Sequence, residues 1–285
     1  MLEDTFGDII QKARSGQGRG WSRAAVAVKA GLTPVEVGRL EQGDIEPTET
    51  QLRSLAKVLG LDGDKLLAIA QGRWRPQPPP ATLSELVTVI EGSIGGYGVH
   101  AYLLHDRETG DAALIDTAAD PDQAIEAVRR AGLSLRQILL THCHGDHAGG
   151  VGTIQRSIPG GAPIHVGASE AGMLSRETSA PVTGLEPDRA AWTTMVGRLT
   201  VTALSTPGHT TGGITYLVTD RGRQMVAFVG DALFAGSVGR ANHSYSLLLS
   251  SIRANILTLD EGVTLLPGHG PATTVGEELS HNPFF

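Results

Sequence analysis

The sequence is poor in several features that mark whole classes of protein. Its 285 residues include one cysteine, so no internal disulfide can form and nothing indicates an oxidising compartment. No stretch approaches the roughly 18 apolar residues that a membrane-spanning helix needs. The opening MLEDTFGDII lacks the basic and long apolar regions of a signal peptide. We therefore expect a cytoplasmic protein that does not engage a membrane.

Positive charge is not in excess either. The formal net charge is −7, which argues against a chain that is dominated by contacts with nucleic acid, although a small basic face could lie within that total. Hydrophobic residues make up 40% and charged residues 19% of the chain, as expected of a globular protein with a buried core. At this length, one large domain or two ordinary ones are expected.

A proline-rich stretch divides the chain into two unequal parts. Residues 73–82, RWRPQPPPAT, contain four prolines and are typical of an extended, semi-rigid connector. We therefore predict one domain over residues 1–72, a linker over residues 73–82 and a second domain over residues 83–285.

The first part has apolar positions spaced by three and four residues, which predicts five short helices. Thr33 followed by Pro34 is typical of a helix start, and Gly31, Gly43 and Gly60 stand where helices should end. The order helix, AGLT turn, second helix, LEQG and closing LAKVLGL resembles the helix-turn-helix domain of phage-repressor-like regulators (XRE/Cro type). The resemblance covers nearly all of residues 4–70.

This resemblance implies DNA binding through the second helix of the motif, at about residues 34–42. That helix offers Pro34, Val35, Glu36 and Gly38 near its start, and Arg39 is the one obvious reader of bases. Residues 1–72 hold nine Lys and Arg against ten Asp and Glu, whereas DNA-binding surfaces are usually basic. The alternative is a helical module that serves for homodimer formation or for docking a partner.

The second part has short strand patterns that alternate with helical ones, which predicts a layered α/β arrangement. The predicted helices are DPDQAIEAVRRAG and YSLLLSSIRANILTL. The predicted strands are AYLLHD, AALID, RQILLTH, PIHVG, RLTVTAL, ITYLVTD, QMVAFVG and VTLLPGH.

Histidines and aspartates follow several of these strands. The candidate metal ligands are His142, His144, Asp146, His147, His209, Asp231 and His269. Four of them stand within six positions of LLTHCHGDH, a cluster that would be costly to bury unless it binds something. Imidazole and carboxylate suit zinc, iron or manganese, and the scarcity of cysteine excludes a closed thiolate zinc site. Seven ligands fit two ions that share a bridging carboxylate.

Other histidines, at positions 100, 105, 165, 243 and 281, are interpreted as surface or hydrogen-bonded core residues.

The motif set in residues 83–285 resembles the metallo-β-lactamase superfamily, which implies an αββα sandwich with its site at one edge between the sheets. TPGHTTGG, GDALFAGSVGR, LLPGHGPATTVGEE and HNPFF resemble its glyoxalase II-like hydrolases.

The resemblance also implies a role for each candidate ligand. The first metal would be held by His142, His144 and His209, the second by Asp146, His147 and His269, and Asp231 would bridge the two. Asp116 resembles the family's carboxylate that steadies a ligand histidine, and the alternative is a helix-capping aspartate. Arg240 is a candidate anion contact in the substrate pocket.

We therefore predict a hydrolase with two divalent metal ions, zinc being favoured over iron or manganese. A hydroxide supplied by the metals and oriented by Asp146 would attack the carbonyl of a small-molecule thioester or ester. Only sixteen residues follow His269, so the helical region that holds the glutathione arm in full-length hydroxyacylglutathione hydrolases has no counterpart there.

Two alternatives remain open at this point. The motif Thr-His-Cys-His-x-Asp-His, which includes Cys143, also resembles the persulfide dioxygenases of the same fold. Those enzymes use one iron ion. The PGHG motif around His269 instead favours the hydrolases. Cys143 itself is predicted to point away from the metals. From another functional class, the chain could be a DNA-binding transcriptional regulator whose second domain senses a metabolite, a metal or a redox state.

Overall fold

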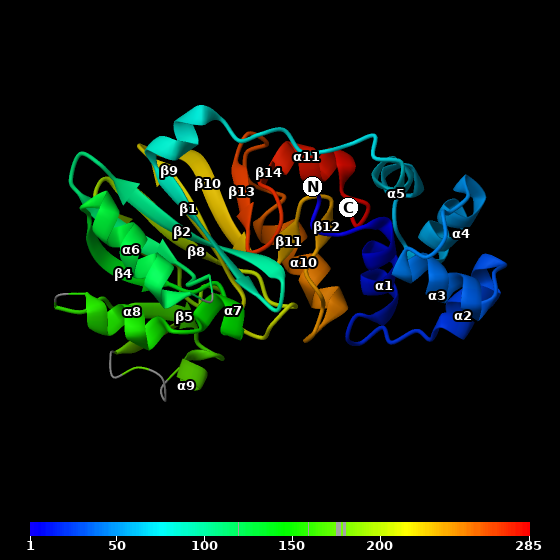
Figure 1. The fold of residues 1–285 in the computed structure, drawn as a ribbon, viewed down its shortest axis with the longest axis horizontal. Helices are drawn as coiled ribbons and strands as arrows, with labels where there is room; N and C mark the ends of the chain where they lie inside the picture. The colour runs from blue at the N-terminus through cyan, green and yellow to red at the C-terminus, as the bar shows by residue number, and fades with distance from the viewer. Residues whose placement is uncertain (119, 159, 175–177, 179–180) are drawn as a thin grey trace.

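The computed structural model describes residues 1–118, 120–158, 160–174, 178 and 181–285. A helical region at the N-terminus adjoins two mixed sheets that pack face to face with helices on their outer sides (Figure 1). This arrangement confirms the predicted fold class. Across the described ranges, the chain forms no helix with the length and apolarity to span a bilayer.

The helical region, residues 1–72, is described throughout and forms five helices as predicted. They are α1 (Phe6–Ser15), α2 (Arg23–Ala30), α3 (Pro34–Gln42), α4 (Glu49–Leu59) and α5 (Gly63–Ala70). Helix α3 begins as its sequence indicates, because the Thr33 side chain accepts a hydrogen bond from the Glu36 backbone and Glu36 bonds back to Thr33. It ends at Gly43, whose φ of 71° is the left-handed conformation that glycine adopts without strain.

The short 3₁₀ helix η1 (Ala81–Glu85) leads into the sandwich region, residues 83–285, whose described residues contain two six-stranded sheets. The first has the order β1 (Val87–Ile94), β2 (Tyr97–Asp106), β3 (Asp111–Ile115), β4 (Ser134–Leu139), β5 (Ile164–Gly167) and β6 (Val182–Leu185). The second has the order β14 (Thr273–Thr274), β13 (Thr264–Pro267), β10 (Arg223–Gly230), β9 (Ile214–Asp220), β8 (Leu199–Ser205) and β7 (Trp192–Val196).

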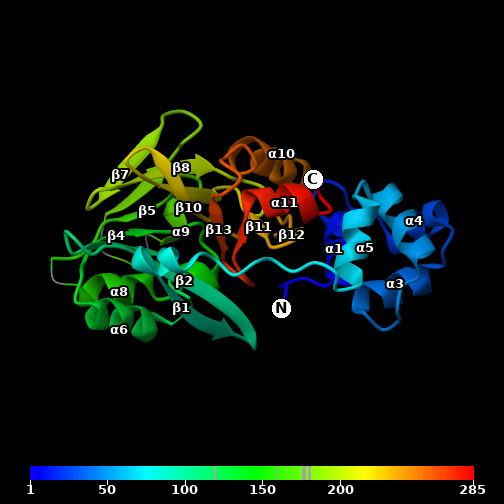
Figure 2. The same ribbon diagram turned by 90° about the horizontal axis from the view of Figure 1, so that it is seen from above.

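Alternating side chains of each strand divide between two cores. Tyr102 and Ile115 of the first sheet join Tyr216 and Phe228 of the second in the layer between the sheets. The opposite faces are covered by helices α6 (Pro121–Ala131) and α8 (Val151–Ser157) on one side, and α10 (Tyr245–Asn255) and α11 (Val275–His281) on the other (Figures 1 and 2). This alternation is the period-two pattern of strands that are buried on both faces.

The predicted strands are all present, whereas the pattern does not reveal the four edge strands β1, β6, β7 and β14. An edge strand has a neighbour on one side only and is partly exposed, as five of the eight residues of β1 are. Its side chains therefore need not be apolar, and the alternation that marks an inner strand is lost. Two further strands, β11 (Leu233–Phe234) and β12 (Ser237–Val238), form a small hairpin after β10.

The helical region packs directly against the sandwich region. Residues 73–80 form no helix or strand, but Trp74 is buried and stacks on His281 of α11, with ring centroids 5.0 Å apart. Lys65 of α5 donates hydrogen bonds to the carbonyls of Leu279 and Phe285. One apolar cluster runs continuously from α1 to α11. The segment is thus anchored by Trp74 near its start, whereas Pro78, Pro79 and Pro80 are exposed.

Candidate metal centre

The candidate ligands lie in loops at one edge of the sandwich. Strands β8 and β10 both run antiparallel to β9, and β10 runs parallel to β13, so β8, β10 and β13 share one direction. Their carboxyl ends therefore meet at the same edge, and these ends lead into the loops of His209, Asp231 and His269. The ends of β3 and β4, which are also parallel, carry Asp116 and the loop of His142.

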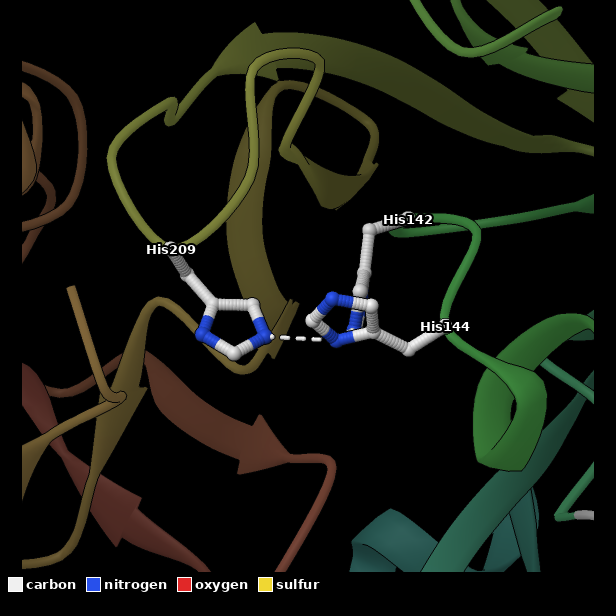
Figure 3. A group of neighbouring side chains, drawn as sticks. All are labelled: His142, His144 and His209. Atoms are coloured by element: carbon white, nitrogen blue, oxygen red, sulfur yellow. Dashed lines mark hydrogen bonds between the residues drawn. The ribbon is translucent and has the colours of Figure 1, made fainter. Parts of the chain in front are cut away.

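The first cluster consists of three imidazole rings. The Nδ1 atom of His144 lies 3.1 Å from Nε2 of His142 and 3.0 Å from Nε2 of His209 (Figure 3). The rings stand nearly perpendicular to one another, with interplanar angles of 82° to 89°. Nitrogens about 2.0–2.1 Å from a tetrahedral zinc ion would lie roughly 3.3 Å apart, so the three atoms have the spacing of one coordination shell.

The second cluster consists of Asp146, His147 and His269. The Oδ2 atom of Asp146 lies 3.4 Å from Nε2 of His269 and 3.7 Å from Nε2 of His147. Asp146 and His147 belong to the short helix α7 (Gly145–Ala148), which begins directly after the His144 loop. The turn into α7 thus sends His142 and His144 to the first cluster, and Asp146 and His147 to the second.

Asp231 lies between the two clusters. Its Oδ2 atom is 3.5 Å from Nε2 of His209, and its Oδ1 atom is 3.3 Å from Nε2 of His147 and 3.6 Å from Nε2 of His269. One carboxylate oxygen therefore faces each cluster, which is the arrangement that a bridging ligand requires.

The donor atoms fit a metal ion. The Nε2 atom of His147 and the Oδ1 atom of Asp231 are buried, and neither has a hydrogen-bond partner in the described part of the chain. A buried polar atom without a partner costs stability, so native proteins rarely retain one without a reason. A cation between the two atoms would satisfy both, and the group sets of the two clusters are of the kind that divalent metals prefer.

Contacts behind the rings orient the histidines. The Nδ1 atoms of His209 and His269 lie 2.7 Å from the Arg240 carbonyl and 2.5 Å from the Gly98 carbonyl, respectively. A nitrogen beside a carbonyl must carry the proton, so Nε2 of each ring is left as a lone-pair donor.

Asp116 contacts His147 from behind in the same way. Its Oδ2 atom lies 2.9 Å from Nδ1 of His147, and its two oxygens accept hydrogen bonds from the backbone and hydroxyl of Thr141, each at 2.8 Å. The helix cap that the alternative interpretation assigned to Asp116 is supplied by Asp120, whose side chain accepts from the first turn of α6. Asp116 therefore links the ends of β3 and β4 to the second cluster.

Burial and charge shift the pKa values of the clustered groups. Burial holds the pKa of His142 well below its ordinary value, and the charge of His147 lowers it further. Burial acts in the same direction on His147, but the carboxylates of Asp231 and Asp116 outweigh it and raise the pKa of His147. Burial alone would raise the pKa of Asp231, yet the charge of His147 prevails and lowers it well below its usual range. Asp231 is therefore held as a carboxylate.

Glu170 is a residue of this site that the sequence does not reveal. Its buried carboxylate accepts a hydrogen bond from the Cys143 backbone at 2.7 Å and from the Gly212 backbone at 2.8 Å. It thereby ties the loop of the first cluster's His142 and His144 to the loop that carries His209. Glu170 lies in a turn after β5 with no neighbouring motif, so only the tertiary structure identifies it.

The remaining candidates lie around the centre or away from it. The Cys143 sulfur is 3.7 Å from the Glu170 carbonyl, and the residue lines an open pocket of about 290 Å³ together with His144, Met173, His209 and Asn242. The guanidinium of Arg240 donates to the Gln11 side chain of α1. Arg39 is exposed on α3, far along the chain from the ligands. Within the described residues, none of the five other histidines joins a metal-type cluster.

Comparison with known proteins agrees with this geometry. Residues 94–275 match the metallo-beta-lactamase superfamily, and residues 11–69 match a helix-turn-helix domain. Hydroxyacylglutathione hydrolase GloC of Haemophilus influenzae is 33% identical over 64% of this chain and 90% of its own length. Persulfide dioxygenase ETHE1 of Bos taurus is 31% identical over 65% of this chain and 70% of its own length. The probable metallo-hydrolase YqgX of Bacillus subtilis is 29% identical over 67% of this chain and 94% of its own length.

Solved structures show the same likeness. The BLEG-1 B3 metallo-beta-lactamase matches with a TM-score of 0.60 and 30% identity, over 70% of this chain and 99% of its own. TTHA1623 in a di-iron-bound form matches with a TM-score of 0.55 and 28% identity, over 68% of this chain and 99% of its own. Because the family match spans more than half of the chain, the protein belongs to the metallo-β-lactamase superfamily, with a helix-turn-helix domain ahead of its His/Asp metal site.

Proposed function

We propose that the protein is a metal-dependent hydrolase of small thioesters or esters. The observation that carries this proposal is the position of Asp231, with one carboxylate oxygen toward each cluster. We assign the first ion to His142, His144 and His209, and the second to Asp146, His147 and His269, with Asp231 shared. A sensor domain has no need for two sites that share a ligand, whereas bond cleavage benefits from a nucleophile and an electrophile side by side.

Two divalent ions at these residues would supply a hydroxide near neutral pH and stabilise negative charge on a carbonyl oxygen. The protein's part is to hold the ligands in place, through Asp116 behind His147 and the Arg240 carbonyl behind His209. The side chain of Asp146 is 22% exposed, against 10% for Asp231. Asp146 is therefore the carboxylate that can reach incoming water, and we assign it the role of orienting the nucleophile.

The open pocket beside the first cluster is where we place one end of the substrate, whose other end would then lie toward the second cluster. Its lining combines the apolar and sulfur-bearing side chains of Met173 and Cys143 with the amide of Asn242. A mixed wall of this kind suits a small acyl group next to a polar leaving group. The guanidinium of Arg240 is bonded to Gln11, so any contact with a substrate anion would require Arg240 to leave that partner.

Metal analysis of the full chain, purified without added metal, tests the proposal together with turnover assays. Two zinc or mixed divalent ions per chain, with hydrolysis of thioesters such as S-lactoylglutathione or simpler acyl thiols, are the expected result. One iron per chain with oxygen consumption on glutathione persulfide would overturn it in favour of the dioxygenase, which the 31% identity to ETHE1 keeps as the second candidate.

The match of residues 11–69 to a helix-turn-helix domain favours DNA binding as a separate activity. Helix α3 exposes Val35, Arg39 and Gln42, but the Glu36 carboxylate occupies its N-terminus, where it accepts hydrogen bonds from Thr33. Phosphate contacts at that end would therefore meet like charge. Binding of genomic DNA fragments across salt concentrations is the test, and an affinity without salt dependence, or none, excludes a regulator that acts through α3.

A further inference from the structure

The first residues of the helical region reach the metal centre. Gly270 follows the ligand His269 directly, and a β-carbon placed on it would lie 2.7 Å from Cβ of Glu3 and 3.2 Å from the Glu3 backbone nitrogen. Gly270 also has a φ of +73°, so this position requires glycine for two reasons. The N-terminal segment thus lies against the loop of the second cluster, between the sandwich and the helices (Figure 2).

The next residue anchors this segment firmly. Asp4 is buried, forms an ion pair with Lys12 of α1 and accepts a hydrogen bond of 2.5 Å from Ser237. Lys12 donates in turn to the Val238 carbonyl at 2.9 Å. Ser237 and Val238 form β12, a few residues beyond Asp231. The segment that carries Glu3 is therefore fixed to the same hairpin that follows the bridging carboxylate.

The helical region also reaches His269 indirectly, through the ring of Phe234. The ammonium of Lys12 lies 4.6 Å from the centre of the Phe234 ring, and that ring meets the His269 ring edge to face, with centroids 5.8 Å apart. Helix α1 thus packs behind Phe234, the ring that meets His269, although the family match begins only at residue 94.

Within the described part of the chain, the Glu3 carboxylate has no hydrogen bond and no ion pair. The Glu3 side chain is half-buried and lies close enough to His269 and Asp231 to interact electrostatically with both. Burial raises the pKa of Glu3, and the charge of His269 opposes that effect. The basic side chains nearby are already engaged, Lys12 by Asp4 and Arg240 by Gln11. Glu3 is therefore an acidic side chain beside the second cluster that no hydrogen bond or ion pair among the described residues engages.

We propose that Glu3 sets the charge specificity of the site, favouring substrates with an amino group near the scissile carbonyl and rejecting those with a carboxylate there. The role of Glu3 in substrate choice rests on the proposed hydrolase function, whereas the binding experiment below does not require hydrolysis. A carboxylate in a partly desolvated rim attracts an ammonium group and repels an anion by more than it would in water. The helix-turn-helix domain would then form part of the substrate site.

Three short thiols that differ only in their far end test this inference. Cysteamine, 2-mercaptoethanol and 3-mercaptopropionate place an ammonium, a hydroxyl or a carboxylate two carbons from a sulfur that binds metal. Calorimetric Kd values at pH 8 are measured on the zinc-loaded full chain and on Glu3→Gln, Glu3→Lys and Glu46→Gln. Glu46 is exposed on the same helical region with no partner among the described residues, so Glu46→Gln is the matched control for loss of one charge.

We expect the Kd ratio of 3-mercaptopropionate to cysteamine to fall by about tenfold in Glu3→Gln and further in Glu3→Lys. The Kd of 2-mercaptoethanol and the ratio in Glu46→Gln should stay within about twofold of the wild type. An equal change for all three thiols in Glu3→Gln, or no change, would overturn the inference.

The same variants separate this inference from the proposed function. The expected thiol ratios without hydrolysis of any thioester would count against the hydrolase and leave the role of Glu3 standing. Thioester hydrolysis with a ratio unchanged in Glu3→Gln would refute the role of Glu3 alone. Failure of the zinc-loaded chain to bind any of the thiols would contradict both.

Discussion

The helical region and the metal centre are built in opposite ways. Each helix of residues 1–72 begins and ends through contacts between residues a few positions apart, such as the Thr33 and Glu36 capping pair. The metal centre instead joins loops that lie between 116 and 269 in the chain, and its support reaches as far as Glu3. Local contacts can be recognised from sequence patterns, whereas a site of this kind depends on the packing that brings the loops together.

Removing the shared ligand should have the largest effect on the non-local site. In Asp231→Ala both clusters lose one donor, so we expect loss of most of the metal and a drop in kcat/KM of about 10³-fold or more, comparable to losing the central electrostatic group of an active site. Elemental analysis and turnover measure this. Two ions per chain in the variant would contradict the bridging assignment.

Trp74→Ala should weaken the contact between the two regions. Trp74 is 9% exposed, stacks on His281 and packs beside Gly236. Its removal should lower the free energy of unfolding by about 3–5 kcal/mol, the cost of a large cavity. Denaturant titration followed by far-UV circular dichroism measures this change. A loss below about 1 kcal/mol would show that Trp74 contributes little to the junction.

Glu278 of α11 should make the stability of this junction depend on pH. Its buried carboxyl accepts from Gly236, Thr273 and Asn282, and burial raises its pKa from an ordinary 4.5 to about 7. The folded state therefore favours the protonated form. This contribution is fully present below pH 4.5 and is lost as the pH rises to about 7, a loss of about 3 kcal/mol.

The side chain of Glu278→Gln cannot ionise. The difference in unfolding free energy between the wild type and this variant should therefore change by about 3 kcal/mol between pH 4.5 and about 7. Urea titrations at several pH values provide the measurement, with Glu277→Gln as the neighbouring control. Parallel stability curves for wild type and Glu278→Gln would show that Glu278 stays ionised throughout.

Asp116 and Asp120 allow the sharpest comparison, because they stand four residues apart and have different roles. Asp116 contacts His147, whereas Asp120 caps α6. Asp116→Asn should weaken metal affinity or activity about 10- to 100-fold through the orientation of His147. Asp120→Asn should keep the cap of α6 and leave metal content unchanged, since asparagine caps helices as well as aspartate. A similar loss in both variants would mean that the effect of Asp116 is only structural.

Much of the molecule follows from patterns in the sequence, for reasons that differ between its parts. The helices of residues 1–72 carry caps and glycine ends, and inner strands such as β2 and β9 are marked by their apolar runs. The edge strand β1 is not, because five of its eight residues are exposed. Glu170 and Glu3 also stand in no motif, since each acts on residues far away in the chain.

The sequence alone determined the fold class, the helical region and the set of side chains that suit a metal, because helix capping, strand alternation and ligand chemistry are properties of short segments. Only the tertiary structure decided which oxygen of Asp231 faces which cluster, that Asp120 and not Asp116 caps α6, and that Trp74 is buried. It alone placed Glu3 beside Gly270. These features arise from contacts between segments distant in the chain, whose energies depend on packing and burial that no local pattern records.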